Sequence, residues 1–388
     1  MDNFKTRSYA TLIPPPAALE HHSPIESALS LLPLQSIRPD LYTNARPLWH
    51  PPGARGIFGG AAIAQCLSAA QATVDTSVYN VHSMHCYFVL AGDADIPVIY
   101  DVERVRDGRS FVTRTVQARQ KGKCIFTTTV SFTRVGSGGR ETVNHARKMP
   151  TMEDVPPPPE GSQDIVALDT KGDDTPFESV RCAVKHIGPV GQKQQPQDKL
   201  LRQWIRARGK ISDCPQSVRE DEALSGVRAN VLGDNHTAHL SALAYMSDSY
   251  FIGTVARVHN LMRFANRKRI EKLLETFQGS DEEGQAMKTY LERIAKEEDE
   301  ENKYNSEAGS KRDDRRIGMM VSLDHSIWFH NPRAFRAFEW MLTEMETPWA
   351  GDGRGLVCQR IWSKDGLLIA TCMQEGVVRL QQQKEIKL

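Results

Sequence analysis

The feature that most constrains the fold is a long internal repeat. The segment 82–133 begins HSMHCYFV and the segment 325–380 begins HSIWFHNP, and both continue through strand-like stretches separated by turns in the same order. The matching turns are Gly108-Arg109 with Gly353-Arg354, followed by Gly122 with Gly366. A period this long indicates that the chain builds one structural unit twice.

Each copy is preceded by an apolar segment rich in small residues that suits a helix, at 58–74 and at 236–255. In the first segment the apolar positions recur with roughly helical spacing, and the small side chains allow a sheet to pack closely around the helix. The strand-like stretches that follow are separated by turn signals, as in a meander of antiparallel strands. The sequence therefore predicts an α+β fold in which each repeat consists of a helix followed by a sheet.

The repeat divides the chain into two domains. Residues 149–164 are rich in proline and acidic side chains and are expected to form a semi-rigid linker between an N-terminal repeat, 1–148, and a C-terminal repeat, 165–388. Within the second repeat, the intensely charged segment 266–316 follows the expected helix. We interpret it as a solvated helical excursion with a disordered tip, inserted between repeat elements.

The charge balance and cysteine pattern limit the classes of partner and the compartment. Forty-nine Lys and Arg residues nearly cancel 48 Asp and Glu residues, so the chain lacks the basic excess that drives nucleic-acid binding. The seven cysteines show no CxxC or Cys/His metal spacing and suit a reducing compartment. No apolar core of a signal peptide and no run of about 20 apolar residues is present, so a soluble, intracellular protein is expected.

Several polar residues are candidates for a site. Gln374 follows the apolar run 367–373, where a buried amide is either a strand-end group that reaches solvent or a placed functional group. Asp324 and His325 form an apparent acid/base pair, but adjacent strand residues point to opposite faces. His236 and His239 have helical spacing without an evident third ligand, so no metal site and no cofactor are predicted.

Several motifs resemble the acyl-CoA thioesterase II family. They are Arg55-Gly-Ile-Phe-Gly-Gly60 with Gln65, Tyr100-Asp-Val-Glu103, Arg106-Asp-Gly-Arg-Ser-Phe111, Leu243-Ala-Tyr-Met-Ser-Asp248, Leu323-Asp-His-Ser-Ile-Trp-Phe-His330 and Gln374-Glu-Gly-Val-Val-Arg379. The resemblance implies a double hot-dog fold, in which each repeat wraps an antiparallel sheet around a long helix. It also implies acyl-CoA as the substrate and thioester hydrolysis as the reaction. The insertion 266–316 and the region 183–235 depart from the family.

The resemblance implies three catalytic residues, which fall at Asp248, Ser322 and Gln374. The family usually has threonine where this chain has Ser322, and serine keeps the hydroxyl that a hydrogen bond needs. Aligning Gly122 with Gly366 places Val130 opposite Gln374, so the first repeat is expected to keep a core residue where the second has an amide. The expected reaction is direct attack by an oriented water, without a covalent intermediate.

Two other functions remain open at this stage. One is an acyl-thioester hydratase or dehydratase with His325 as the base, and the other is a protein that binds acyl-CoA without turnover. Association into homo-oligomers through sheet edges is a further expectation. The C-terminal Ile386-Lys387-Leu388 keeps two residues of a peroxisomal Ser-Lys-Leu signal, which favours the peroxisome over the cytosol.

Overall fold

The computed structural model describes residues 11–15, 22–50, 56–158, 175–189, 195–212, 235–262 and 313–382, together with separate helical positions between 271 and 299. The C-terminal tripeptide and most of the charged segment 266–316 therefore lie outside the described residues. Among the described residues, no helix is both long and apolar enough to cross a membrane.

The first repeat contains a helix followed by four antiparallel strands, as the sequence predicts. Helix α2 (Gly59–Gln71) precedes β3 (Tyr79–Phe88), β4 (Ile99–Asp107), β5 (Phe111–Gln120) and β6 (Lys123–Arg134). The alanine-rich sequence of α2 favours a helix, and burial of nearly its whole circumference fixes it against the sheet. Upstream lie α1 (Pro24–Leu29), β1 (Leu31–Pro33) and β2 (Leu41–Asn44).

The second repeat follows the same order with additions. Helix α3 (His236–Ser247) precedes β12 (Asp324–Phe329), β13 (Met341–Gly351), β14 (Arg354–Trp362) and β15 (Leu368–Leu380). Between α3 and β12 lie α4 (Gly253–Val258), β10 (Leu261–Met262) and β11 (Asp313–Ser322), and before α3 lie β7 (Phe177–Arg181), β8 (Lys185–His186), the 3₁₀ turn η1 (Pro196–Asp198) and β9 (Lys199–Ala207). The charged segment thus ends inside strand β11.

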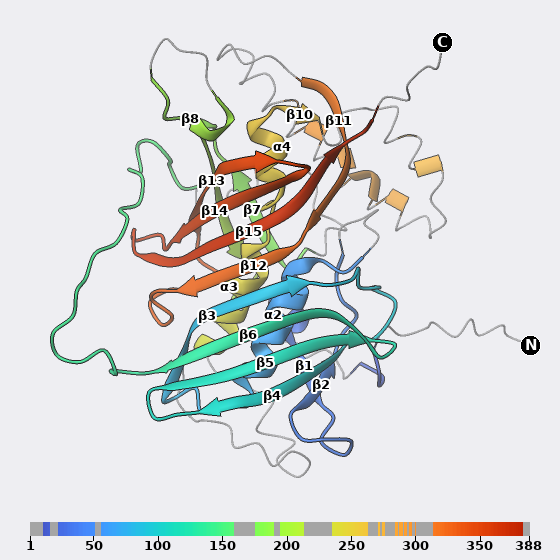
Figure 1. Cartoon of the computed structure of the whole chain (residues 1–388), viewed down its shortest axis with the longest axis vertical. Helices are drawn as coiled ribbons and strands as arrows, with labels where there is room; N and C mark the ends of the chain where they lie inside the picture. The colour runs from blue at the N-terminus through green and yellow to red at the C-terminus, as the bar shows by residue number, and fades with distance from the viewer. Residues whose placement is uncertain are drawn as a thin grey trace, which may run out of the picture.

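The two repeats join into one continuous sheet, with the strand order β1-β2-β4-β5-β6-β3-β12-β15-β14-β13-β9-β7. Strands β3 and β12 form the junction through antiparallel pairs such as Met84 with Ile327. Helices α2 and α3 lie behind the sheet in Figure 1, next to that junction. The antiparallel order and the two central helices confirm the α+β prediction.

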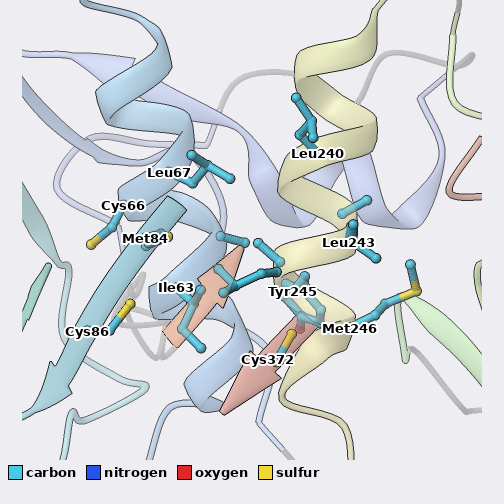
Figure 2. Packing of buried hydrophobic residues seen from close by; sticks show 14 of the residues in the cluster. Ile63, Cys66, Leu67, Met84, Cys86, Leu240, Leu243, Tyr245, Met246 and Cys372 are labelled. Carbon is cyan, nitrogen blue, oxygen red and sulfur yellow. The ribbon is translucent and has the colours of Figure 1, made fainter. Parts of the chain in front are cut away.

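Helices α2 and α3 are packed side by side, with buried side chains from both helices and from the sheet around them (Figure 2). The two backbones approach closely at Gly60, where a Cβ atom would lie 2.1 Å from the carbonyl oxygen of Tyr245. Further along, the Ser68 hydroxyl donates to the Ser241 hydroxyl at 2.9 Å. Since an early residue of α2 meets the end of α3, the helices run antiparallel.

The prediction of one helix across 236–255 was wrong, because the helix ends at Ser247 and α4 begins only at Gly253. Tyr250 lies between them with a φ of 55°, a left-handed conformation that interrupts the helical hydrogen bonding. The break makes Asp248 the C-terminal cap of α3, with φ −85° and ψ 2°. Because the helix ends here, the Asp248 side chain can contact Gln374 on β15 of the sheet.

Candidate active site

Gln374 is the centre of a polar group in the second repeat. It lies on β15 on the face that meets the helices, and its side chain is fully buried. Its amide nitrogen donates to Oδ1 of Asp248 at 3.2 Å and also to the Ser322 hydroxyl oxygen. The structure therefore brings together all three residues that the sequence singled out, and both NH₂ protons of one amide connect them.

Ser322 lies where two strand pairings meet. At this residue β11 pairs with β15, opposite Gly376. Strand β12 pairs with β3 from Asp324 and again with β15 from Ser326, opposite Met373, so the register against β15 shifts by one residue between β11 and β12. Leu323 bridges the two: its N–H donates to the carbonyl of Glu375 and its own carbonyl accepts from the N–H of Phe88, each at 2.9 Å. This irregularity aims the Ser322 hydroxyl at Gln374, in the way that ladder irregularities often redirect side chains beside active sites.

The first repeat contributes to the site through the N-terminus of α2. The backbone N–H of Gly60 donates to the Asp248 carboxylate. A Cβ atom on Gly59 would lie 2.5 Å from Oδ2 of Asp248, so only glycine leaves room for the carboxylate there. Sequence reasoning did not assign Gly59 or Gly60 to the site, although both are in the Phe-Gly-Gly motif that supports the family resemblance.

Burial controls the charge of Asp248. Removal from water is the largest influence and raises the pKa of the carboxyl to about 7, against the opposing hydrogen bonds from Gln374 and from Gly60. The positive end of α2 acts in the same direction as those hydrogen bonds but does not overcome the desolvation. At neutral pH the carboxyl is therefore divided between its acid and base forms, as a proton-transfer group requires.

Asp324 and His325 have separate environments, as expected for adjacent strand residues. Asp324 is half-buried, and its Oδ1 accepts the N–H of Glu375 at 2.8 Å. His325 is fully buried, with Nδ1 3.4 Å from Oε1 of Gln374 and Nε2 3.0 Å from the Ser247 hydroxyl. Burial lowers the pKa of the imidazole to about 4, so His325 is neutral at physiological pH. The sequence did not reveal its contact with Gln374.

The first repeat has a core residue at the position of Gln374, but it is Phe132 and not Val130. Val112 and Val357 each stand three residues after the arginine of the shared Gly-Arg turn, and they pair with Phe132 and Gln374 respectively. The alignment on Gly122 and Gly366 failed because the intervening turn has two residues in the first repeat, 121–122, and five in the second, 363–367. Phe132 is fully buried.

One histidine of the pair on α3, His239, has a structural contact. Nδ1 of His239 accepts the backbone N–H of Ala337 at 3.1 Å. Within the described part of the chain, no group of three or more His, Cys, Asp or Glu side chains has an arrangement that could hold a metal ion.

The chemistry available at the site is hydrolysis of an activated acyl group. A half-buried carboxyl with a pKa near neutrality can remove a proton from water, and a hydroxyl and an amide next to it can orient that water. On a sheet packed against two helices, this arrangement is compatible with a hydrolase that acts on an activated acyl group such as a thioester.

Comparison with protein families makes the assignment specific. Residues 46–133 match the acyl-CoA thioesterase N-terminal domain and residues 150–378 match the acyl-CoA thioesterase C-terminal domain. The chain belongs to the acyl-CoA thioesterase family, and it is an enzyme that hydrolyses acyl-CoA thioesters. This confirms the family resemblance, the reaction and the substrate class expected from the sequence.

Three related thioesterases are similar in sequence to this chain along most of their length. Acyl-coenzyme A thioesterase 8 of Rattus norvegicus is 34% identical over 365 residues, which cover 90% of this chain and 88% of the relative. Acyl-CoA thioesterase 2 of Haemophilus influenzae is 29% identical over 341 residues, covering 85% of this chain and 90% of the relative. The peroxisomal acyl-coenzyme A thioester hydrolase 1 of Saccharomyces cerevisiae is 22% identical, covering 94% of this chain and 97% of the relative.

Solved structures support the fold. An acyl-CoA thioesterase II, TesB2, from Mycobacterium marinum superposes with a TM-score of 0.56 at 27% identity, covering 93% of this chain and 99% of its own. A hot-dog protein from Alicyclobacillus acidocaldarius superposes with a TM-score of 0.53 at 16% identity, covering 92% of this chain and 98% of its own. The architecture of the chain is therefore that of hot-dog thioesterases.

Proposed function

We propose that Asp248, Ser322 and Gln374 hold and activate the water that hydrolyses the acyl-CoA thioester. The observation that carries the proposal is the amide of Gln374, whose nitrogen donates to both Asp248 and Ser322. Gln374 is fully buried, whereas Asp248 and Ser322 are partly accessible, so a water can meet the latter two while the amide fixes their positions.

In the proposed reaction the water oxygen attacks the thioester carbonyl carbon while Asp248 accepts one water proton. The carbonyl oxygen becomes an oxyanion, and the backbone N–H groups at the start of α2, which lies against the Asp248 carboxylate, are the proposed donors to it. Collapse of the tetrahedral intermediate then breaks the carbon–sulfur bond, and the CoA thiolate takes up the proton. No covalent acyl-enzyme forms.

The environment of His325 argues against the hydratase alternative. A catalytic base has to reach substrate, whereas His325 is fully buried and both ring nitrogens face protein partners, Gln374 and Ser247. Its low pKa also makes it a poor base near pH 7. Asp248, with a pKa of about 7 and a partly accessible side chain, is the better candidate.

Measurement of CoA release tests the proposed function. We expect the purified enzyme to release free CoA thiol and carboxylic acid in equal amounts from an acyl-CoA, within a series from acetyl to palmitoyl. Intact-protein mass spectrometry after rapid quenching should detect no acyl adduct. A hydratase would leave the thioester intact, a binding protein would turn over negligibly, and an acyl adduct would contradict direct attack by water.

We also infer that the chain is a double hot-dog with repeats at 1–148 and 165–388. The repeated order of one helix and four strands and the separate matches at 46–133 and 150–378 support this division. Strands β1 and β7 end the sheet path, and we propose sheet edges as the surfaces for any homo-oligomer. Light scattering coupled to size-exclusion chromatography measures the oligomeric state, and a monomer would contradict the proposed association.

We propose a peroxisomal location. The Saccharomyces cerevisiae relative is named as a peroxisomal enzyme, and the chain ends in Ile386-Lys387-Leu388, which lies outside the described residues. A fluorescent protein fused to the N-terminus leaves this tail free and should give puncta that coincide with a peroxisomal marker. Diffuse fluorescence would favour the cytosol.

A further inference from the structure

We propose that His325 is a positioning residue that fixes the orientation of the Gln374 amide, so that the amide presents its NH₂ group to Asp248 and Ser322. This inference rests on the proposed function of those three residues and adds a role for a side chain that touches none of the reacting atoms. It makes the site a chain of contacts that begins at Ser247 and passes through His325 to Gln374.

The argument begins with the two ends of the Gln374 side chain. An ionised Asp248 carboxylate can only accept hydrogen bonds, so the end of the amide that faces Oδ1 has to be the NH₂ group. The carbonyl oxygen, Oε1, then faces Nδ1 of His325 at 3.4 Å. A buried carbonyl oxygen needs a donor, and Nδ1 supplies one only when it carries the imidazole proton.

The same reasoning determines the other imidazole nitrogen. Burial keeps His325 neutral, so the ring carries one proton, and with that proton on Nδ1 the nitrogen Nε2 is an acceptor. The Ser247 hydroxyl lies 3.0 Å from Nε2 and can donate to it. The ring of Phe251 packs edge-on against the imidazole, with centroids 5.4 Å apart, and holds the ring plane.

A wrongly oriented amide would harm the site directly. Rotation by half a turn would place Oε1 against the Asp248 carboxylate and leave Ser322 without the NH₂ donor. The carboxylate would lose a stabilising hydrogen bond and gain a repulsive contact, and both changes would raise its pKa further. The effect of His325 can therefore be measured through the pH dependence of turnover, which a purely structural histidine would leave unmoved.

Other titratable groups near the Ser247–His325–Gln374 contacts do not obscure the pH dependence of turnover. Burial raises the pKa of the Tyr245 hydroxyl above its usual value and that of the Cys86 thiol to about 12, so both stay neutral below pH 9. His325 titrates at about 4 and stays neutral above pH 5. Asp324, with a raised pKa, points away from the imidazole and accepts the Glu375 N–H.

The test compares two substitutions that differ in where they place a donor. The amide nitrogen of asparagine occupies nearly the place of Nδ1, so His325→Asn retains a donor to Gln374. Leucine has no donor, so His325→Leu removes it. We expect His325→Asn to keep kcat within about threefold of wild type, and His325→Leu to lower kcat by about 10- to 100-fold with little change in KM. In His325→Leu the rising limb of the kcat–pH profile should move up by about half a pH unit or more.

His82→Leu is the matched control, because His82 is the corresponding residue of the first repeat and contacts Ser131 at 2.8 Å. It should leave kcat and the pH midpoint nearly unchanged. Circular dichroism and thermal melting check that each variant is folded. The kcat values of His325→Asn and His325→Leu are compared only for folded protein.

Two results would overturn the inference. The first is a folded His325→Leu variant whose kcat and kcat–pH midpoint equal those of the wild type. The second is an equal decrease in kcat in His325→Asn and His325→Leu with no shift of the kcat–pH midpoint. Asp248→Asn, measured alongside, separates this failure from failure of the proposed function. If Asp248→Asn is impaired while the His325 variants contradict the expectation, only the positioning role fails. If Asp248→Asn is fully active, the proposed function fails as well.

Discussion

The pKa of Asp248 links its surroundings to a measurable property of the enzyme. Desolvation raises the pKa to about 7, and only the ionised form can accept a proton from water. Raising the pH through this value increases the ionised fraction, so kcat should increase with pH and reach half of its plateau near pH 7. The profile is best measured by chromatographic assay of CoA, and a plateau that extends to pH 5 would contradict the role of Asp248.

Ser322 provides a second prediction at this scale. Ser322→Ala removes the hydroxyl that accepts from Gln374, and we expect a decrease in kcat of roughly tenfold or more. Ser322→Thr keeps the hydroxyl and restores the residue that the family usually has, so it should retain most of the activity. Steady-state kinetics with one acyl-CoA tests the pair, and equal activity of both variants would mean that the hydroxyl is dispensable.

At the scale of elements, the close contact between α2 and α3 determines where Asp248 lies. Gly60 meets the carbonyl of Tyr245, three residues before Asp248, and its own N–H binds the carboxylate. The two helices come from different repeats, so each repeat supplies one side of the site. This explains why the helix N-terminus of the first repeat and the Asp248 carboxyl of the second face one another.

Gly60→Ala should therefore disturb stability and activity together. The new methyl group would lie 2.1 Å from the Tyr245 carbonyl, and separation of the helices should cost roughly 1–3 kcal/mol and lower the melting temperature by several degrees. It should also lower kcat, because the hydrogen bond to Asp248 lengthens. Gly138→Ala is the control, since its added Cβ would meet only a Thr142 methyl at 3.7 Å. Wild-type melting and kcat in Gly60→Ala would contradict this account.

Whole-molecule organisation was predictable where local patterns repeat. The helix of small residues and the strands with regular turns predicted the shared order of a helix and four strands in both repeats, because hydrophobic periodicity and glycine turns are local signals. The additional elements α4, β10 and β11 of the second repeat were not predicted. The end of α3 was not predictable, since the left-handed residue is Tyr250, a residue type that rarely adopts that conformation. The residue of the first repeat that corresponds to Gln374 was predicted wrongly, because the turn before β15 is three residues longer than the turn before β6.

The candidate site was predictable only in part. The resemblance gave Asp248, Ser322 and Gln374, and the structure brings them together. Gly60 and His325 join them through contacts between segments far apart in the chain, which alternation along a strand cannot reveal. Periodicity indicates which face a residue occupies, but only the folded chain determines its partner.

The charged segment 266–316 should be dispensable for catalysis. Its described residues include Met287 and Leu291, which are buried in a small cluster with Leu274 and Ala295, separate from the main core. Long surface insertions change the entropy of loop closure little. Replacement of 266–312 by a short Gly/Ser loop, which leaves β11 intact, should give a folded enzyme with CoA-releasing activity. Complete inactivity of that folded variant would mean that the segment takes part in binding acyl-CoA.

The turnover of Asp248→Asn is the most direct test of the central claim, because the substitution preserves the shape of the side chain and removes its charge. If Asp248 is the general base of a water held with Ser322 and Gln374, kcat should fall by roughly 10²-fold or more while KM changes little. Combined with Gln374→Ala, it should lose far less than the product of the two single losses, since the residues act as a unit. Folded Asp248→Asn that hydrolyses its best acyl-CoA at the wild-type rate would contradict the account.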